Sequence, residues 1–180
     1  MSDTIRFGNL SITIEERPDE VVYTFVGDVD EHFRQKDVPR IKKAGIRFVL
    51  EDINNFNSCG IREWIYLIKD IGELGELRFQ RCSVTMIDQI NMVPDSLGNG
   101  VVESFYAPYY CASEECGGEV NRLINVGEAQ DFLTNKQAPD FNCDKWEKSL
   151  NLMLWKRATF CSQKARFPKH LKNRAAERLR

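Results

Sequence analysis

The N-terminal part of the chain begins with two apolar segments of strand-like pattern. Residues 10–15 alternate strictly between apolar and polar positions, and residues 21–26 form a β-branched and aromatic run. Both patterns are typical of strands. A turn over residues 17–20 separates them, because Pro18 presets a turn dihedral and Asp19 can bond the backbone. We therefore predict a β-hairpin.

The centre of the chain predicts a strand followed by an amphipathic helix. Residues 46–50 are apolar apart from Arg47, which favours a strand buried on both faces. After the polar turn 57–61, apolar residues recur at helical spacing. They are Ile61, Trp64, Ile65, Ile68 and Ile71. Asn57 or Ser58 is the expected N-cap, so the turn lies where a strand ends and a helix begins.

The remaining elements complete an α/β pattern. Residues 37–43 predict a short helix with Val38 and Ile41 facing inward. The other expected elements are a strand over residues 77–80, a helix capped by Ser83 and ended by Pro94, and a strand over residues 101–106. This order predicts a mixed β-sheet with helices packed on one face, over residues 1–108.

The character of the chain changes after Pro108, and we predict a C-terminal extension over residues 109–180. A cysteine knuckle with Gly117-Gly118 precedes an apolar run over residues 120–126. An amphipathic helix is expected further on, with Asp144 and Glu147 as its reciprocal cap. Its apolar residues are Trp146, Leu150, Met153 and Leu154.

Composition bears on where in the cell the protein is expected. The hydrophobic content is 42 %, which is enough for a core, but no apolar run approaches the roughly 20 residues that cross a bilayer. The first ten residues also lack the apolar segment of a secretory signal. We therefore expect a cytoplasmic protein that does not associate with membranes.

Charge divides the chain unequally. The net charge of −2 combines a basic tail of +8 over residues 156–180 with a body of −10. Such a tail can bind nucleic acid, an acidic partner or its own body, or it can be a solvated helical segment. Aromatic residues within it, such as Phe167, could stack on nucleotides, but they also suit the apolar face of a helix.

Six cysteines raise the question of a metal. Structural zinc requires four ligands that close a tetrahedron. Cys111 and Cys116 form one knuckle and Cys143 begins a second, but Trp146 stands where the fourth thiolate of a zinc ribbon would fall. The fourth ligand could be Cys161 or His170. The extension therefore resembles a degenerate zinc ribbon, and the alternative is a small packed unit with free thiols and no cofactor.

Two short motifs resemble those of the STAS domain, which is found in anti-sigma-factor antagonists and anion-transporter tails. Gly27-Asp28-Val29-Asp30, expected to end the second strand, is similar to the family's G-x-L-D. Asn57-Ser58-Cys59-Gly60-Ile61 aligns without gaps on its D-S-S-G-L. The resemblance covers about 60 % of the chain.

The resemblance implies a non-enzymatic partner-switching module. A kinase that doubles as an anti-sigma factor would dock at the turn, and phosphorylation of the motif's second serine would break the complex. The implied docking residues are Asp28, Asp30, Asn57, Ser58, Cys59, Gly60, Ile61 and Arg62.

This sequence departs from the family at three positions. Cys59 replaces the phosphoacceptor serine, Asn57 replaces an acidic residue, and Val49 stands at a strand position that is usually acidic. A thiol is not an ordinary substrate of a serine kinase. We therefore expect a binding module that the usual phosphorylation does not switch off, with Ser58 as the remaining candidate for phosphorylation.

Two alternatives stay open. Cys59 could be a reactive thiol, because a helix N-terminus lowers a thiol's pKa, although neither His32 nor His170 is close to it in sequence. Alternatively, the cysteine-containing basic C-terminal part could act as a metal-dependent or nucleic-acid-binding regulator.

Overall fold

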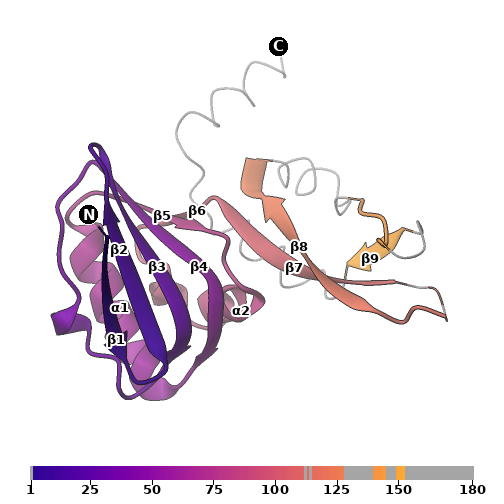
Figure 1. The fold of residues 1–180 in the computed structure, drawn as a ribbon, viewed down its shortest axis with the longest axis horizontal. Helices are drawn as coiled ribbons and strands as arrows, with labels where there is room; N and C mark the ends of the chain where they lie inside the picture. Colours follow the sequence, from indigo (N-terminus) through magenta and orange to yellow (C-terminus); the bar gives the residue numbers. More distant parts are fainter. Residues whose placement is uncertain (1, 112, 114, 128–139, 145–148, 153–180) are drawn as a thin grey trace, which may run out of the picture.

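The chain forms two β-sheets, one with helices and one without. The computed structural model describes residues 2–111, 113, 115–127, 140–144 and 149–152. Within them, a six-stranded sheet has the strand order β1-β2-β3-β4-β5-β6, and a three-stranded sheet has the order β8-β7-β9 (Figure 1). The predicted mixed α/β class is therefore confirmed for the N-terminal part of the chain.

The six-stranded sheet begins with three antiparallel strands. They are β1 (Ser2–Phe7), β2 (Leu10–Glu16) and β3 (Glu20–Val29). The predicted hairpin is confirmed, and the Arg17 N–H closes its turn by donating to the Glu20 carbonyl at 2.9 Å. The sequence did not predict β1, because this edge strand is largely exposed and lacks clear apolar alternation.

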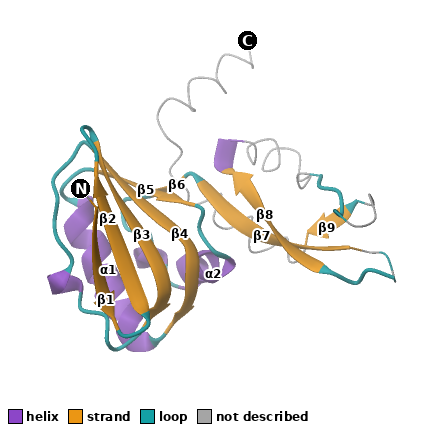
Figure 2. Ribbon diagram, viewed as in Figure 1, coloured by secondary structure: helices purple, strands orange, loops and turns teal. Residues whose placement is uncertain are grey.

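The other half of the sheet is parallel and carries the helices. β4 (Gly45–Phe56), β5 (Glu76–Gln80) and β6 (Val101–Val102) continue from β3 in parallel register. The helices α1 (Ser58–Gly72) and α2 (Val84–Met92) connect β4 to β5 and β5 to β6. Both connections advance in the same direction, so right-handed crossovers place both helices on one face. Figure 2 shows them together behind the sheet.

The predicted strand over residues 46–50 is longer and less buried than expected. Ile46, Phe48 and Leu50 are buried under the helices, whereas Arg47 and Val49 on the other face are partly exposed. Burial on both faces is therefore wrong. Because Val49 is apolar although it lies on the outer face, the alternation of apolar and polar residues is not evident in the sequence. The outer face carries ion pairs such as that of Arg47 with Glu20, at 2.8 Å.

The predicted helix over residues 37–43 is absent. Only a single 3₁₀ turn, η1 (Gln35–Asp37), forms, and Val38 after it is extended at φ −80° and ψ 122°. The helical conformation is disfavoured for a residue that precedes proline, and Val38 is followed by Pro39. Val38 is nevertheless buried, and Ile41 packs against the core, so their inward placement is confirmed.

The core fixes α1 against the sheet. Trp64 is fully buried, and its indole N–H donates to the Ser96 carbonyl at 2.9 Å. Its ring lies 5.2–6.5 Å, between centroids, from those of Phe25, Phe48, Phe56 and Phe79. Of the predicted apolar face, Trp64, Ile68 and Ile71 are buried, while Ile61 and Ile65 remain partly exposed. The start of α1 is thus held in place by a rigid aromatic cluster.

The predicted strand over residues 101–106 belongs to two sheets. β6 ends at Val102, and β7 (Ser104–Cys111) pairs instead with β8 (Glu119–Asn125) and β9 (Leu150–Leu152). The predicted domain boundary near Pro108 falls inside β7, where Pro108 pairs with Asn121. One hydrophobic cluster includes residues of both sheets.

The predicted C-terminal helix is wrong at its centre. Leu150 is a buried strand residue opposite Cys111, because pairing with β7 overrides the local helical pattern. The proposed cap partner Asp144 instead forms an ion pair with Arg122, at 2.8 Å. Other residues of that prediction, Trp146, Glu147, Met153 and Leu154, lie outside the described residues, as does the basic tail over residues 156–180.

Candidate functional site

The two motifs singled out in the sequence meet at one end of the six-stranded sheet. β3 ends at Val29 and β4 ends at Phe56, which are paired in parallel register. The N–H of Asn57, the next residue, donates to the Val29 carbonyl at 3.2 Å. The end of β3 and the beginning of α1 are therefore neighbours, although about 30 residues separate them in sequence.

Gly60 allows this close approach. An ideal Cβ built at Gly60 would lie 1.9 Å from the Val29 carbonyl oxygen, well inside van der Waals contact. A residue with a side chain would push α1 away from the end of β3. Gly60 is buried in this contact, so it positions the neighbouring residues and is not itself exposed to a partner.

Asn57 caps α1 and also contacts the loop after β3. Its Oδ1 accepts from the Gly60 N–H at 2.9 Å, and its Nδ2 donates to the Glu31 carboxylate. An aspartate could make the first contact, but it would place a second negative charge beside Glu31. An amide at position 57 therefore caps the helix without adding a negative charge beside Glu31.

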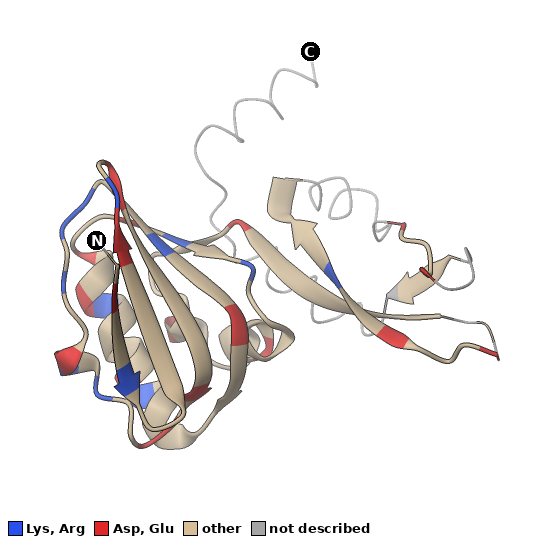
Figure 3. Cartoon of the chain, in the orientation of Figure 1, with Lys and Arg blue, Asp and Glu red and all other residues tan. Residues whose placement is uncertain are grey.

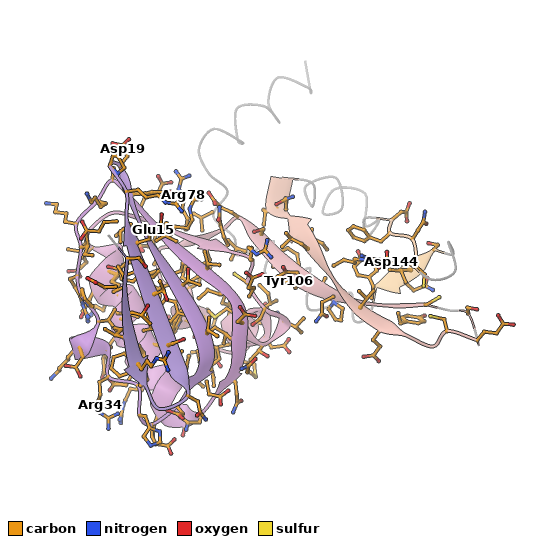
Figure 4. All side chains as sticks on the ribbon, in the orientation of Figure 1. Glu15, Asp19, Arg34, Arg78, Tyr106 and Asp144 are labelled. Carbon is orange, nitrogen blue, oxygen red and sulfur yellow. The ribbon has the colours of Figure 1, made fainter. Side chains whose placement is uncertain are left out.

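The residues around this contact that are at least partly exposed are grouped here under one name, the carboxyl edge. It consists of Asp28, Asp30, Ser58, Cys59, Ile61 and Arg62. Ser58, Cys59 and Arg62 are exposed, and the other three are partly exposed. Figure 4 labels Arg34 at this end of the sheet and Asp19 at the opposite end, where β3 begins.

The loop after β3 adds residues that the sequence reasoning did not select. Asp30 accepts from the His32 N–H at 2.8 Å, and its carboxylate lies 3.1 Å from His32 Nδ1. Asp30, Glu31 and His32 offer ligand atoms that all lie within 4.8 Å of one another. Asp30 was already among the predicted docking residues, whereas the only signal for Glu31 and His32 was their position directly after a predicted strand end.

Cys59 has the exposure that a reactive thiol needs, but within the described residues it has no hydrogen bond to a histidine. It is an exposed first-turn residue of α1. The fold brings His32 to the same end of the sheet, where the side chain of His32 hydrogen-bonds Asp30. In the described part of the chain, no hydrogen bond joins the Cys59 thiol to a histidine, so a nucleophile–base pair has no geometric support here.

A second group of chemically active residues lies in the three-stranded sheet. Cys111 ends β7, Cys116 lies in the following turn, and Cys143 lies near β9. Their sulfur atoms are all within 4.8 Å of one another, and those of Cys116 and Cys143 are 3.8 Å apart. The structure thus brings together the three cysteines that the sequence proposed as metal ligands. Cys161 and His170 lie outside the described residues.

The surroundings of Cys111 have opposing effects on the pKa of its thiol. A hydrogen bond from the Ser113 backbone lowers the pKa of Cys111, whereas burial and the contacts with Cys143 and Cys116 raise it. Together these effects leave the pKa of Cys111 above its ordinary value. A metal-free Cys111 would therefore be held as a thiol.

Comparison with known proteins does not assign the chain to a family, so it is described by its fold and its candidate sites. No protein-family model matches the chain, and no curated protein matches it either. Among the described residues, no helix has both the length and the apolar character needed to span a membrane. The chain is thus defined as a mixed α/β protein with a helix-bearing sheet, a carboxyl edge and a separate cysteine cluster.

Proposed function

We propose that this protein is a non-enzymatic interaction module, similar to the STAS domains of anti-sigma-factor antagonists, and that it binds a protein partner through the carboxyl edge. The main support is the contact of Gly60 with Val29. This contact joins the two resembling motifs into one surface and leaves Ser58, Cys59 and Arg62 exposed on it. The expected partner class is a kinase that also acts as an anti-sigma factor, in a signalling pathway.

The partner is expected to stay bound under conditions in which phosphorylation releases the partners of STAS domains. Phosphorylation adds between one and two negative charges at neutral pH, which repel acidic groups of a partner and are costly to desolvate. Cys59 stands at the usual acceptor position and cannot be phosphorylated by an ordinary serine kinase. The surface would therefore act as a constitutive docking site or scaffold.

Affinity capture with the full-length protein tests the docking surface. Cys59→Asp places a carboxylate on the carboxyl edge, and Ala44→Asp places one at the opposite end of the same sheet, where Ala44 is also small, neutral and exposed. A partner retained by the wild type and by Ala44→Asp, but lost by Cys59→Asp, supports the proposal. Equal retention by all three proteins contradicts it.

Phosphorylation of the captured complex tests the missing switch. With the captured kinase and ATP, the wild type should remain unmodified by intact-mass measurement, whereas Cys59→Ser should gain one phosphate and release the partner. Ser58→Ala in the Cys59→Ser background identifies the modified residue. Stoichiometric phosphate on Ser58 of the wild type would show that the switch is intact.

A second candidate function concerns the C-terminal part. The convergence of three cysteines favours a metal-dependent role for the three-stranded sheet. Nucleic-acid binding would depend on the basic tail over residues 156–180, and its affinity would fall steeply with salt. Failure of the full-length protein to retain DNA or RNA at both low and high salt would remove the nucleic-acid candidate.

A further inference from the structure

The cysteine cluster is built from two distant parts of the chain. Cys111 and Cys116 come from the end of β7 and the turn that follows it, whereas Cys143 comes from a segment 27 residues beyond Cys116. β9 lies beside β7, with Leu150 opposite Cys111, and the Leu150 N–H donates to the Phe141 carbonyl at 2.7 Å. Sheet pairing thus brings Cys143 to the knuckle.

The spacing of the sulfur atoms fits a metal rather than a disulfide. The sulfur atoms of Cys116 and Cys143 are 3.8 Å apart, whereas a disulfide bond is about 2.05 Å long. Two thiolates that bind one tetrahedral zinc ion at about 2.3 Å stand about 3.8 Å from each other. The Cys111 sulfur lies within 4.8 Å of both, so a small inward movement of this sulfur completes a three-thiolate face.

The turn after Cys111 positions the Cys116 sulfur atom. The Ser113 carbonyl accepts from the Cys116 N–H at 3.0 Å and from the Gly117 N–H at 2.9 Å. Gly117 has a φ of +49°, and a Cβ at Gly118 would lie 3.3 Å from the Cys116 sulfur. Both glycines therefore allow the chain to turn back close to the Cys116 sulfur.

The pocket beside the cluster carries one cation, Arg122, and two acidic residues, Glu119 and Asp144, of which Asp144 pairs with Arg122 at 2.8 Å. Three thiolates on a divalent cation leave a net charge of −1. Arg122, whose guanidinium donates to the Asn142 carbonyl at 3.0 Å, lies beside Cys143 and lines the same pocket. This pocket, of about 230 Å³, is also lined by Cys116, so a fourth ligand can approach the cluster from that side.

We propose that Cys111, Cys116 and Cys143 bind one zinc ion as thiolates. Binding releases three thiol protons and involves no change of oxidation state. The ion would cross-link the β7–β8 turn to the segment that leads into β9, and thereby hold the three-stranded sheet closed. Zinc is favoured over harder cations because its preferred ligands include thiolate sulfur and its usual geometry is tetrahedral. This site is independent of the carboxyl edge and goes beyond the proposed docking function.

Metal content of the full-length protein, purified without chelator, tests the proposal. Elemental analysis should find one zinc ion per chain in the wild type and in the control Cys59→Ser, whose cysteine is exposed on α1. Each of Cys111→Ser, Cys116→Ser and Cys143→Ser should lose at least about tenfold in zinc affinity. Replacement with cobalt should give the red-region absorption of tetrahedral thiolate coordination. A metal-free wild type that also fails to bind added zinc or cobalt would overturn the proposal.

Thiol labelling of the wild type keeps the proposal testable if the serine variants do not fold. Before chelation, an alkylating agent should modify Cys59 but not the three clustered cysteines. After chelation, Cys116 should become reactive, because it is only partly buried, while Cys82, which is buried where the two sheets are joined, remains protected as an internal reference. Labelling that is unchanged by chelation, or a Cys116–Cys143 disulfide in the freshly purified protein under reducing conditions, would contradict a zinc site.

Discussion

At the scale of single residues, Asn57 combines a structural and a positional role. Its amide oxygen caps α1 and its amide nitrogen contacts Glu31 after β3. A single side chain thus orders both halves of the carboxyl edge. The positions of its exposed neighbours, Ser58 and Cys59, depend on this cap, because α1 begins directly after Asn57.

Replacing Asn57 with alanine should destabilise the protein by about 1 kcal/mol, because an N-terminal N–H of the helix loses its acceptor. Chemical denaturation of full-length protein measures the change. Asn57→Ser is the matched control, since serine caps well without reproducing the amide's contact with Glu31, and it should lose less than alanine does. An alanine variant as stable as the wild type would exclude a capping role.

Tyr109 gives the three-stranded sheet a pH dependence. Burial, together with the nearby charge of Asp140, raises the pKa of Tyr109 from 10 to about 12. The folded state therefore retains the phenolic proton more strongly than the unfolded state does. Its contribution to stability is complete below pH 10 and is lost as the pH rises through 12.

The free energy of unfolding should consequently fall less steeply between pH 10 and pH 12 in Tyr109→Phe than in the wild type. Denaturant titrations at a series of pH values measure both slopes. Tyr23 and Tyr106, whose pKa values are also raised, remain in both proteins and serve as a common background. Identical slopes would mean that Tyr109 titrates alike in the folded and unfolded states.

The sequence predicts residue roles well where the physics is local. Either Asn57 or Ser58 was predicted to cap α1, and Ser83 to cap α2; the structure has Asn57 and Ser83, which accept the expected backbone N–H bonds. Such bonds join residues three positions apart, so the sequence itself contains both partners. The roles of Glu31 and His32 could not be predicted, because their contacts depend on where β3 and α1 meet in space.

At the scale of secondary-structure elements, the start of α1 depends on its distance from β3. The contact between Gly60 and the Val29 carbonyl fixes this distance. The helix is otherwise positioned by Trp64 and the aromatic cluster around it. A change at Gly60 therefore alters the carboxyl edge while most of the core is kept.

Gly60→Ala should destabilise the protein by about 2 kcal/mol, because the strain of overpacking exceeds the roughly 1 kcal/mol that alanine gains in helix propensity. It should also weaken partner capture. Gly127→Ala is the control, since a Cβ at Gly127 meets no atom within 4 Å, and its effect should stay within about 0.5 kcal/mol. Unchanged stability in Gly60→Ala would contradict the close packing of α1 on β3.

The two errors in helix prediction have different causes. Residues 37–43 and the segment around Leu150 both have helix-like apolar spacing, yet neither forms a helix where it is described. Pro39 excludes the first helix locally, and strand pairing with Cys111 overrides the second. Where a strand is paired over a long sequence separation, the local pattern alone does not decide its conformation.

At the scale of the whole molecule, a short connection joins the two sheets. Cys82 bridges to Phe105 in parallel, and the Tyr106 N–H donates to the Cys82 carbonyl at 2.8 Å. The adjacent Arg81 pairs with Glu51 of β4 and, at 2.7 Å, with the Tyr106 hydroxyl of β7. Figure 4 labels Tyr106 between the sheets, and Figure 3 shows charges of both signs over these elements.

Arg81 makes this connection at a backbone cost. Its φ of +51° lies in the left-handed region, which favours glycine. Arg81→Gly and Arg81→Ala both remove the ion pair, but only glycine relieves the backbone. Glycine should therefore be more stable than alanine by about 1 kcal/mol in denaturant unfolding. Alanine equal to glycine would contradict the left-handed conformation.

The dissociation constant of the captured complex shows whether the partner docks on the carboxyl edge, as we propose. Isothermal titration at fixed salt should compare the full-length wild type, Cys59→Asp and Ala44→Asp. We predict that Cys59→Asp weakens binding at least about tenfold, or about 1.4 kcal/mol, and that Ala44→Asp changes it by less than about twofold. A Cys59→Asp variant that binds the partner as tightly as the wild type would contradict the account.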